Sequence, residues 1–144
     1  MPFPSETRRA LLEEHARLRV LLAELEDLAE RTRAGDDPGR RFGAVAGQLL
    51  RALEVHNEAE ERVLAPLLRL TDAWGPERIG EMTQEHAAEH VALRAALAEP
   101  EHAALARKVP ELAKELRIHM AREEATFLAP EVLTDDVVTD GPDE

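Results

Sequence analysis

The chain has 144 residues, of which 44% are hydrophobic, 33% are charged and only 3% are aromatic, and its formal net charge is −12. This length suits one domain with its own core, and the acidic balance argues against nucleic acid or an anionic membrane surface as a partner. The absence of cysteine excludes disulfides, thiolate catalysis and sulfur-ligated metals, and together with the lack of a membrane-spanning run or a signal peptide it predicts a cytoplasmic protein.

Leucine and alanine recur at steps of three and four residues along four stretches of the chain, which predicts four amphipathic helices. The first helix is expected from Ser5 to just before Gly35. Glycine, aspartate and proline at 35–39 are typical of a loop that ends one helix and begins another. The second helix is expected over 40–70, and Pro66 should kink or close it.

The third and fourth helices are bounded by prolines. The turn at 74–76, which contains Trp74, should lead into the third helix, and Pro100 interrupts that helix. The fourth periodic stretch covers 105–127. Within it, Pro110 is expected either to split off a short leading helix or to start the main one.

Four helices with short connections predict an all-α fold, namely an up-down-up-down antiparallel four-helix bundle. The bundle is expected over residues 1–132. Residues 133–144 are rich in aspartate and are expected to form an acidic, flexible tail. The sixth histidine, His102, lies outside the helical stripes and is expected at the surface.

Each predicted apolar stripe is interrupted by histidine or glutamate. These positions are His15 on the first helix, His56 and Glu60 on the second, His86 and His90 on the third, and His119 and Glu123 on the fourth. Residues four apart lie one above the other on a helix face, so each pair can reach one point. Hydrogen bonding among these groups would be a structural explanation, but a common layer of buried polar groups on four helices favours a metal site.

Seven such groups exceed the capacity of one ion, and two ions bridged by both carboxylates would use all of them. Nitrogen and carboxylate ligands without sulfur suit iron, manganese or zinc. If a solvent oxygen also bridges, five histidines divide three and two, and one metal keeps an open position. A small diatomic molecule could bind there.

The order of these residues resembles the hemerythrin-like (HHE cation-binding) domain family over about residues 8–130. The resemblance implies a hemerythrin-like bundle around a non-haem di-iron centre with an oxo or hydroxo bridge, so iron is expected in preference to manganese or zinc. The implied ligands are His86, His90 and His119 on the six-coordinate iron, His15 and His56 on the open iron, and Glu60 with a fourth-helix carboxylate as bridges.

The fourth helix offers two adjacent carboxylates for that last bridge. The helical stripe favours Glu123. Oxygen-carrying relatives place the carboxylate five residues after its histidine, and the repeat of Leu-Ala-Pro at 64–66 and 128–130 also favours Glu124. We take Glu123 as the bridge and keep Glu124 as the alternative.

Several functions could share this site. The first is binding of O₂ or a related small diatomic molecule for storage, sensing or carriage, inside an apolar pocket. Candidate pocket walls are Leu18, Leu22, Leu53, Leu93, Leu116 and Phe127. The second is an enzyme acting on O₂, peroxide, NO or an organic substrate, with an electron donor that the sequence does not identify. The third is a metal-handling or regulatory module.

Other classes fit less well. Ferritin-like di-iron proteins use Glu-x-x-His, and the one instance here, Glu99 to His102, straddles Pro100. The metalloprotease pattern His-Glu-x-x-His is absent from the sequence. Binding of a diatomic molecule at a di-iron centre is therefore the hypothesis taken forward, with a metal-free structural bundle as its simplest competitor.

Overall fold

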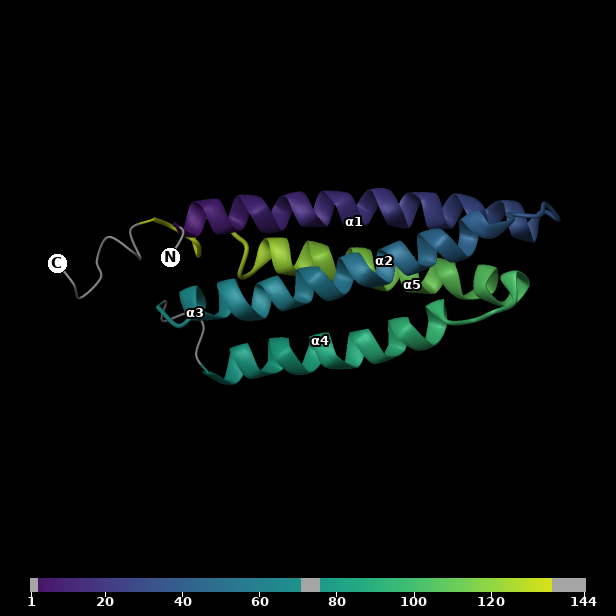
Figure 1. The fold of residues 1–144 in the computed structure, drawn as a ribbon. Helices are drawn as coiled ribbons and strands as arrows, with labels where there is room; N and C mark the ends of the chain where they lie inside the picture. The colour runs from purple at the N-terminus through teal and green to yellow at the C-terminus, as the bar shows by residue number, and fades with distance from the viewer. Residues whose placement is uncertain (1–2, 71–75, 136–144) are drawn as a thin grey trace.

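The computed structural model describes residues 3–70 and 76–135, and within these ranges it is helical and contains no strand. The elements are α1 (Pro4–Arg33), α2 (Arg40–Ala59), a π-helical turn η1 (Glu60–Leu64), α3 (Ala65–Leu68), α4 (Pro76–Leu97) and α5 (His102–Ala125). In Figure 1 the chain runs along α1 from the end near the N-terminus, returns along α2, and then runs out along α4 and back along α5. No helix in the described ranges is long and apolar enough to cross a membrane.

The connection between α1 and α2 forms as its composition predicts. Gly35 has φ of +100°, a backbone conformation that other residues rarely adopt. Its N–H donates to the Thr32 carbonyl at 3.1 Å, and the Asp36 N–H donates to the Arg31 carbonyl at 2.9 Å. This pair of bonds satisfies carbonyls at the end of α1 and turns the chain back toward α2.

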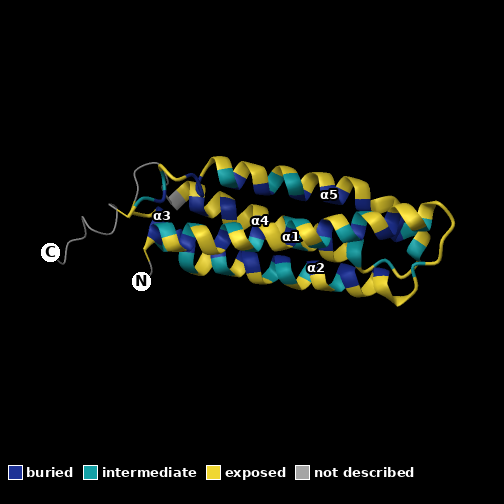
Figure 2. Cartoon of the chain, turned by 90° about the horizontal axis from the view of Figure 1, so that it is seen from above, coloured by how far each residue is buried: buried dark blue, intermediate teal, exposed yellow. Residues whose placement is uncertain are grey.

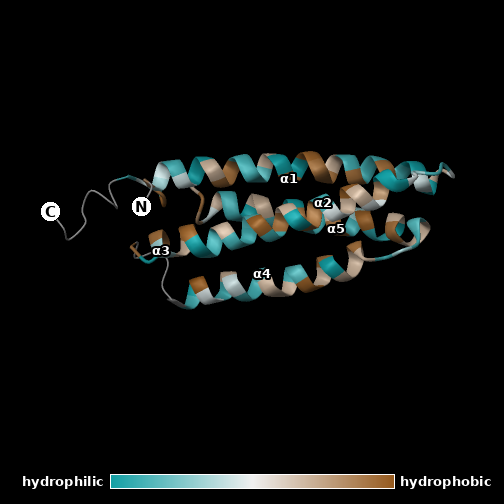
Figure 3. Ribbon diagram, in the orientation of Figure 1, coloured by the Kyte–Doolittle hydropathy of each residue, from teal (hydrophilic) through white to brown (hydrophobic). Residues whose placement is uncertain are grey.

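The buried apolar side chains form two clusters separated by the polar layer. One cluster, toward the α1–α2 loop, includes Leu18, Leu22, Leu53, Leu93 and Leu116. The other, toward the chain termini, includes Leu11, Leu64, Met82, Phe127 and Leu128. Figure 2 shows buried surfaces facing inward along all four long helices, and Figure 3 shows hydrophobic and hydrophilic residues alternating along them. The six expected pocket walls are thus all buried, although Phe127 belongs to the second cluster.

The π-helical turn changes which residues of the second helical stretch are buried near Glu60. The Ala65 N–H donates to the Glu60 carbonyl five residues back, so the turn contains one residue more than an α-helical turn. The α-helical stripe predicts Val63 in the core, but Leu64 is fully buried and Val63 is only half-buried. Pro66, which cannot donate a backbone hydrogen bond, follows directly and leads into the short α3.

The expectation that Pro110 divides the fourth helix is wrong, because α5 runs unbroken from His102 to Ala125. A proline leaves the carbonyl four residues earlier, here that of Ala106, without its helical donor. The Arg33 guanidinium of α1 supplies the missing donor, with Nη1 2.7 Å from the Ala106 oxygen. A contact between two helices therefore satisfies the carbonyl that the proline leaves free.

The beginning of the expected flexible tail packs on the bundle. Leu133 is buried, and Asp135 accepts hydrogen bonds from the Ser5 N–H and hydroxyl, each at 2.9 Å. The rest of the tail, 136–144, lies outside the described residues, as does Trp74. His102 is half-buried rather than at the surface, with its ring centroid 5.7 Å from that of Phe42.

Replacing Arg33 by alanine should lower the free energy of unfolding by about 1–2 kcal/mol, because it leaves the Ala106 carbonyl without a donor. Chemical denaturation measures this loss. Arg31→Ala is the matched control, since Arg31 forms an exposed pair with Asp27 on the same helix and should cost less than about 0.5 kcal/mol.

Arg33→Ala should lower the free energy of unfolding by less when it is made in a Pro110→Ala protein. There the backbone N–H that the substitution restores can donate to the Ala106 carbonyl and replace the contact from Arg33. Equal destabilisation by the Arg33 and Arg31 replacements would contradict this account of the unbroken helix.

Candidate metal centre

Four histidines, one from each long helix, direct a ring nitrogen into the layer between the two apolar clusters. These are His15 on α1, His56 on α2, His86 on α4 and His119 on α5. Glu60 and Glu123 enter the same layer from η1 and α5, and both are buried. Since apolar residues precede and follow each of these positions at helical spacing, packing of the two clusters forces the polar groups inward.

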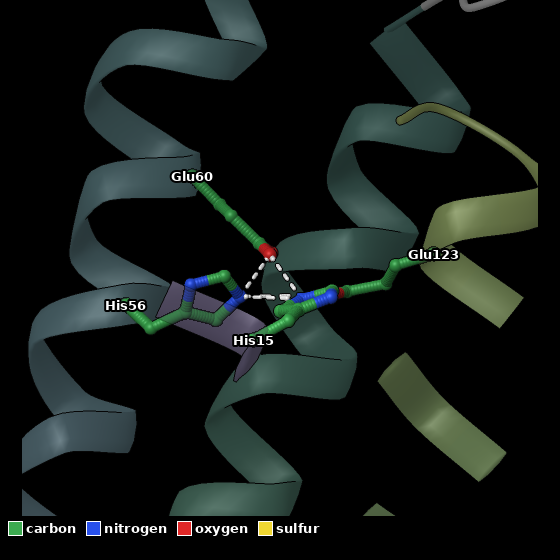
Figure 4. Close-up of side chains that lie close together, drawn as sticks. All are labelled: His15, His56, Glu60 and Glu123. Atoms are coloured by element: carbon green, nitrogen blue, oxygen red, sulfur yellow. Dashed lines mark hydrogen bonds and ion pairs between the residues drawn. The ribbon is translucent and has the colours of Figure 1, made fainter. Parts of the chain in front are cut away.

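The first half of the site joins His15 and His56. Their Nε2 atoms lie 3.0 Å apart, and His56 Nε2 also makes a short contact with Glu60 Oε1. Glu123 Oε1 lies 2.9 Å from His15 Nε2 and 3.6 Å from His56 Nε2. Figure 4 shows these four side chains converging on one point, where their ligand atoms lie within 4.8 Å of one another.

The second half of the site joins His86 and His119. Glu123 Oε2 lies 2.7 Å from His119 Nε2 and 3.4 Å from His86 Nε2. Glu60 Oε2 lies 2.9 Å from His86 Nε2. Each carboxylate therefore has one oxygen toward the first pair of histidines and its other oxygen toward the second pair, as a carboxylate that bridges two cations would.

Hydrogen bonds satisfy the polar layer only in part, and the clearest of them join His15 to His56 and to Glu123. Within the described residues, both oxygens of Glu60 and Nε2 of His119 have no hydrogen-bond partner, although charged groups lie within 3 Å of them. The facing Nε2 atoms of His15 and His56 can bond to each other only if one of them lacks a proton. Converging nitrogen and oxygen atoms, of which several have no hydrogen-bond partner, fit a pair of cations well, and nitrogen with carboxylate oxygen suits iron, manganese or zinc.

The histidines take up protons readily when no cation is present. Burial opposes the imidazolium form, but the close contacts with the carboxylates of Glu60 and Glu123 outweigh it and raise each pKa above the usual 6.5. The pKa rises to about 9 for His15, to about 11 for His56 and to about 10 for His86. The pKa of His119 is raised as well.

The two central carboxylates stay ionised. Burial would raise the pKa of Glu60 and of Glu123, yet the surrounding imidazoles hold both below the usual range. The layer is thus an anionic centre that requires positive charge, either from protons on the histidines or from metal cations.

Two of the residues expected from the sequence lie outside this convergence. His90 is 37% exposed, and its Nε2 is 2.9 Å from Glu54 Oε1, a carboxylate that Arg94 also contacts. Glu124 lies behind the site, with Oε2 2.7 Å from Nδ1 of His15. The five histidines therefore do not divide three and two in this structure, because two face each side.

Glu89 is a residue of the site that the stripe analysis missed, because it lies beside the apolar stripe of α4. Its Oε2 is 3.1 Å from Nδ1 of His119, its side chain is largely buried, and burial raises the pKa of its carboxyl. A glutamate three residues after an inward histidine is the sequence signal that could have identified it.

The site is reached from the side of α4 and α5. His119 is 12% exposed, whereas the other three histidines are 3% exposed or less. A small cavity of about 120 Å³ is lined by His119 and Glu123, together with Met82 and Phe127. A wider groove of about 560 Å³ between the same helices is lined mainly by apolar side chains and extends from Glu89.

A protein-family model matches most of the chain. The model described as "Hemerythrin HHE cation binding domain" matches residues 7–129, which is most of the chain. No curated protein and no solved structure matched the sequence. The matched range contains all six residues that converge in the polar layer.

The metal-free protein should lose thermal stability as the pH rises from about 6.5 to about 10. The raised histidine pKa values mean that the imidazolium–carboxylate contacts contribute fully below the unfolded pKa of 6.5 and are lost as the pH passes through 9 to 11. Melting followed by circular dichroism after chelation and dialysis measures the trend.

The metal-loaded protein is the comparison for this experiment. Cations require deprotonated imidazoles, so metal uptake should strengthen over the same pH range. A melting temperature of the metal-free protein that increased from pH 6.5 to 10 would contradict the arrangement of charges described above.

Proposed function

We propose that this chain, which belongs to the hemerythrin HHE cation-binding family, is a non-haem di-iron protein that binds O₂ or a related small diatomic molecule. When bound, two iron ions with an oxo or hydroxo bridge would supply redox chemistry and an open position for the ligand. The proposal takes the helices as an up-down-up-down antiparallel bundle, in keeping with the chain direction in Figure 1. It also takes the protein to be cytoplasmic, as the absence of cysteine suggests.

One observation carries this proposal, namely that Glu60 and Glu123 each extend between two pairs of histidines. The proposed ligands are His15 and His56 on one side, His86 and His119 on the other, and the two carboxylates as bridges. Four protein donors on each side leave room for a further ligand at an ion that accepts six.

The open position is proposed on the side of His119, whereas the family resemblance implies the side of His15 and His56. His119 is the most exposed of the four histidines, and the cavity of about 120 Å³ beside it has room for a diatomic molecule. Met82 and Phe127 form the apolar part of the cavity wall, and charged side chains such as Glu81, Glu85 and Arg122 form much of the rest. The leucines of the larger apolar cluster close the opposite side of the polar layer.

His90 and Glu124 could coordinate a metal only if their side chains moved from the positions they have in this structure. Coordination by His90, as the family resemblance implies, requires its side chain to leave Glu54 and turn into the layer. Glu124 can replace Glu123 as a bridge only by leaving His15 and the guanidinium of Arg19. We therefore propose Glu123 as the bridge and leave His90 to experiment.

A di-iron enzyme is the second candidate, and the groove between α4 and α5 is the observation that favours it. Its walls include Ala88, Ala92, Ala96, Leu112 and Leu116. An apolar organic molecule could lie along this groove with one end at Glu89. Because burial raises the pKa of Glu89, this carboxyl could also hold a proton close to His119.

Anaerobic reconstitution with ferrous iron should load about two irons per chain. Metal analysis gives the stoichiometry, and optical spectra after addition and removal of O₂ show what the centre does. A charge-transfer band that disappears on deoxygenation supports reversible binding. Irreversible oxidation would favour the enzyme, and failure to bind about two metals would refute the di-iron proposal.

Replacing His86 or His90 by alanine tests the ligand set with a matched pair on one helix. His86→Ala should reduce the bound iron to about half, because it removes a ligand of one side. His90→Ala should keep the wild-type iron content and spectrum. Equal loss of iron in the two variants would show that His90 turns inward and coordinates, as the family resemblance implies.

A further inference from the structure

A glutamate lies at the outer nitrogen of each of the four inward histidines. The distances from Nδ1 to the nearest carboxylate oxygen are 2.7 Å for His15 and Glu124, 2.7 Å for His56 and Glu14, 3.3 Å for His86 and Glu61, and 3.1 Å for His119 and Glu89. All four histidines thus present the same nitrogen, Nε2, to the centre of the layer. We call Glu14, Glu61, Glu89 and Glu124 the outer ring.

The outer ring connects the helices in a closed circuit. Glu14 of α1 contacts the histidine of α2, and Glu61 of η1, which continues α2, contacts the histidine of α4. Glu89 of α4 contacts the histidine of α5, and Glu124 of α5 contacts the histidine of α1. Each of the four helical stretches therefore supplies one glutamate to the ring, and its own histidine is contacted by a glutamate from another stretch. Such a regular exchange is not expected from surface charges that pair by chance.

We infer that the outer ring consists of positioning residues, which hold the Nδ1 proton of each histidine and so leave Nε2 free to bind a cation. A neutral imidazole carries one proton, and a hydrogen bond from Nδ1 to a carboxylate decides which nitrogen keeps it. The anionic acceptor also makes the imidazole a stronger donor to a metal. This inference rests on the proposed function, since it concerns the same metal centre.

The burial of the outer ring supports this role. Its side chains are 18 to 40% exposed, whereas the two central glutamates are at most 3% exposed. Arg19 holds Glu124 through two contacts, of 2.8 and 3.0 Å, which fixes the carboxylate beside His15. The outer ring thus lies at the border of the buried layer, where a carboxylate costs less free energy than at its centre.

The outer ring also explains the repeated pair of glutamates in the sequence. In Glu60-Glu61 and in Glu123-Glu124 the first glutamate enters the polar layer, and the second reaches the histidine of the neighbouring helix. Adjacent residues on a helix point about 100° apart, so one pair can serve both positions. Glu123 and Glu124 are therefore not competing ligands in this inference: Glu123 bridges the metal ions and Glu124 positions His15.

Zn²⁺ binding by Glu14 variants tests the inference, with the neighbouring Glu13 as control. Glu14→Ala should weaken Zn²⁺ binding by about 10- to 100-fold, as is typical when the carboxylate partner of a metal-bound histidine is lost. Glu14→Gln should retain part of the affinity, because its amide oxygen can still accept the Nδ1 proton. Glu13→Ala and Glu13→Gln remove the same charge from an exposed neighbour and should bind like the wild type.

Nitrogen NMR of the Zn²⁺-loaded proteins supplies a readout that general destabilisation would not change. In the wild type, His56 should bind through Nε2 and carry its proton on Nδ1. This proton should exchange faster with water in Glu14→Ala than in Glu13→Ala. The comparison of Glu61→Ala with Glu58→Ala should repeat the result at His86.

Two outcomes would overturn the outer ring. One is equal Zn²⁺ affinity in the Glu14 and Glu13 variants, and the other is coordination of His56 through Nδ1. If the wild type binds two Zn²⁺ ions and Glu14→Ala is unaffected, the outer ring is wrong while the proposed metal centre stands. If the wild type takes up no metal, both proposals fail.

Discussion

The burial of two ionised carboxylates at the centre of the bundle is the constraint on which the rest of the structure depends. Each buried charge costs several kcal/mol unless opposite charge compensates it. Around Glu60 and Glu123 the compensation comes from four imidazoles, which take up protons in the metal-free protein. Protons and metal cations therefore compete for one anionic cavity, and the occupant of the cavity determines how the bundle responds to pH.

The polar layer also organises the surrounding fold. Apolar clusters lie on both sides of it, so the layer is buried by packing that is independent of any metal. The π-helical turn begins at Glu60 and moves the next buried position from Val63 to Leu64. Irregular turns of this kind are frequent at functional sites. Here the turn places Glu60 inside the polar layer and Glu61 at the outer nitrogen of His86 on α4.

The two sides of the layer differ in their access to solvent, and this difference bears on function. The side of His15 and His56 is enclosed, whereas His119 lines a cavity between α4 and α5. In the proposed function, the small cavity beside His119 receives the diatomic ligand. The longer groove that starts at Glu89 could admit an organic molecule. Access to the proposed metal centre thus depends on α4 and α5, and not on the enclosed half of the site.

The sequence by itself determined which residues lie on the inner face of each helix, because helical periodicity is a local property of the chain. The four long helices, the chain reversal at Gly35 and the inward positions of His15, Glu60 and Glu123 follow from it. The tertiary structure decided whatever depends on a neighbouring helix. Arg33 allows α5 to continue through Pro110, Glu54 holds His90 outside the layer, and the glutamates of the outer ring each contact the histidine of another helix. These contacts join residues far apart in the chain, so the spacing of residues within one helix does not reveal them.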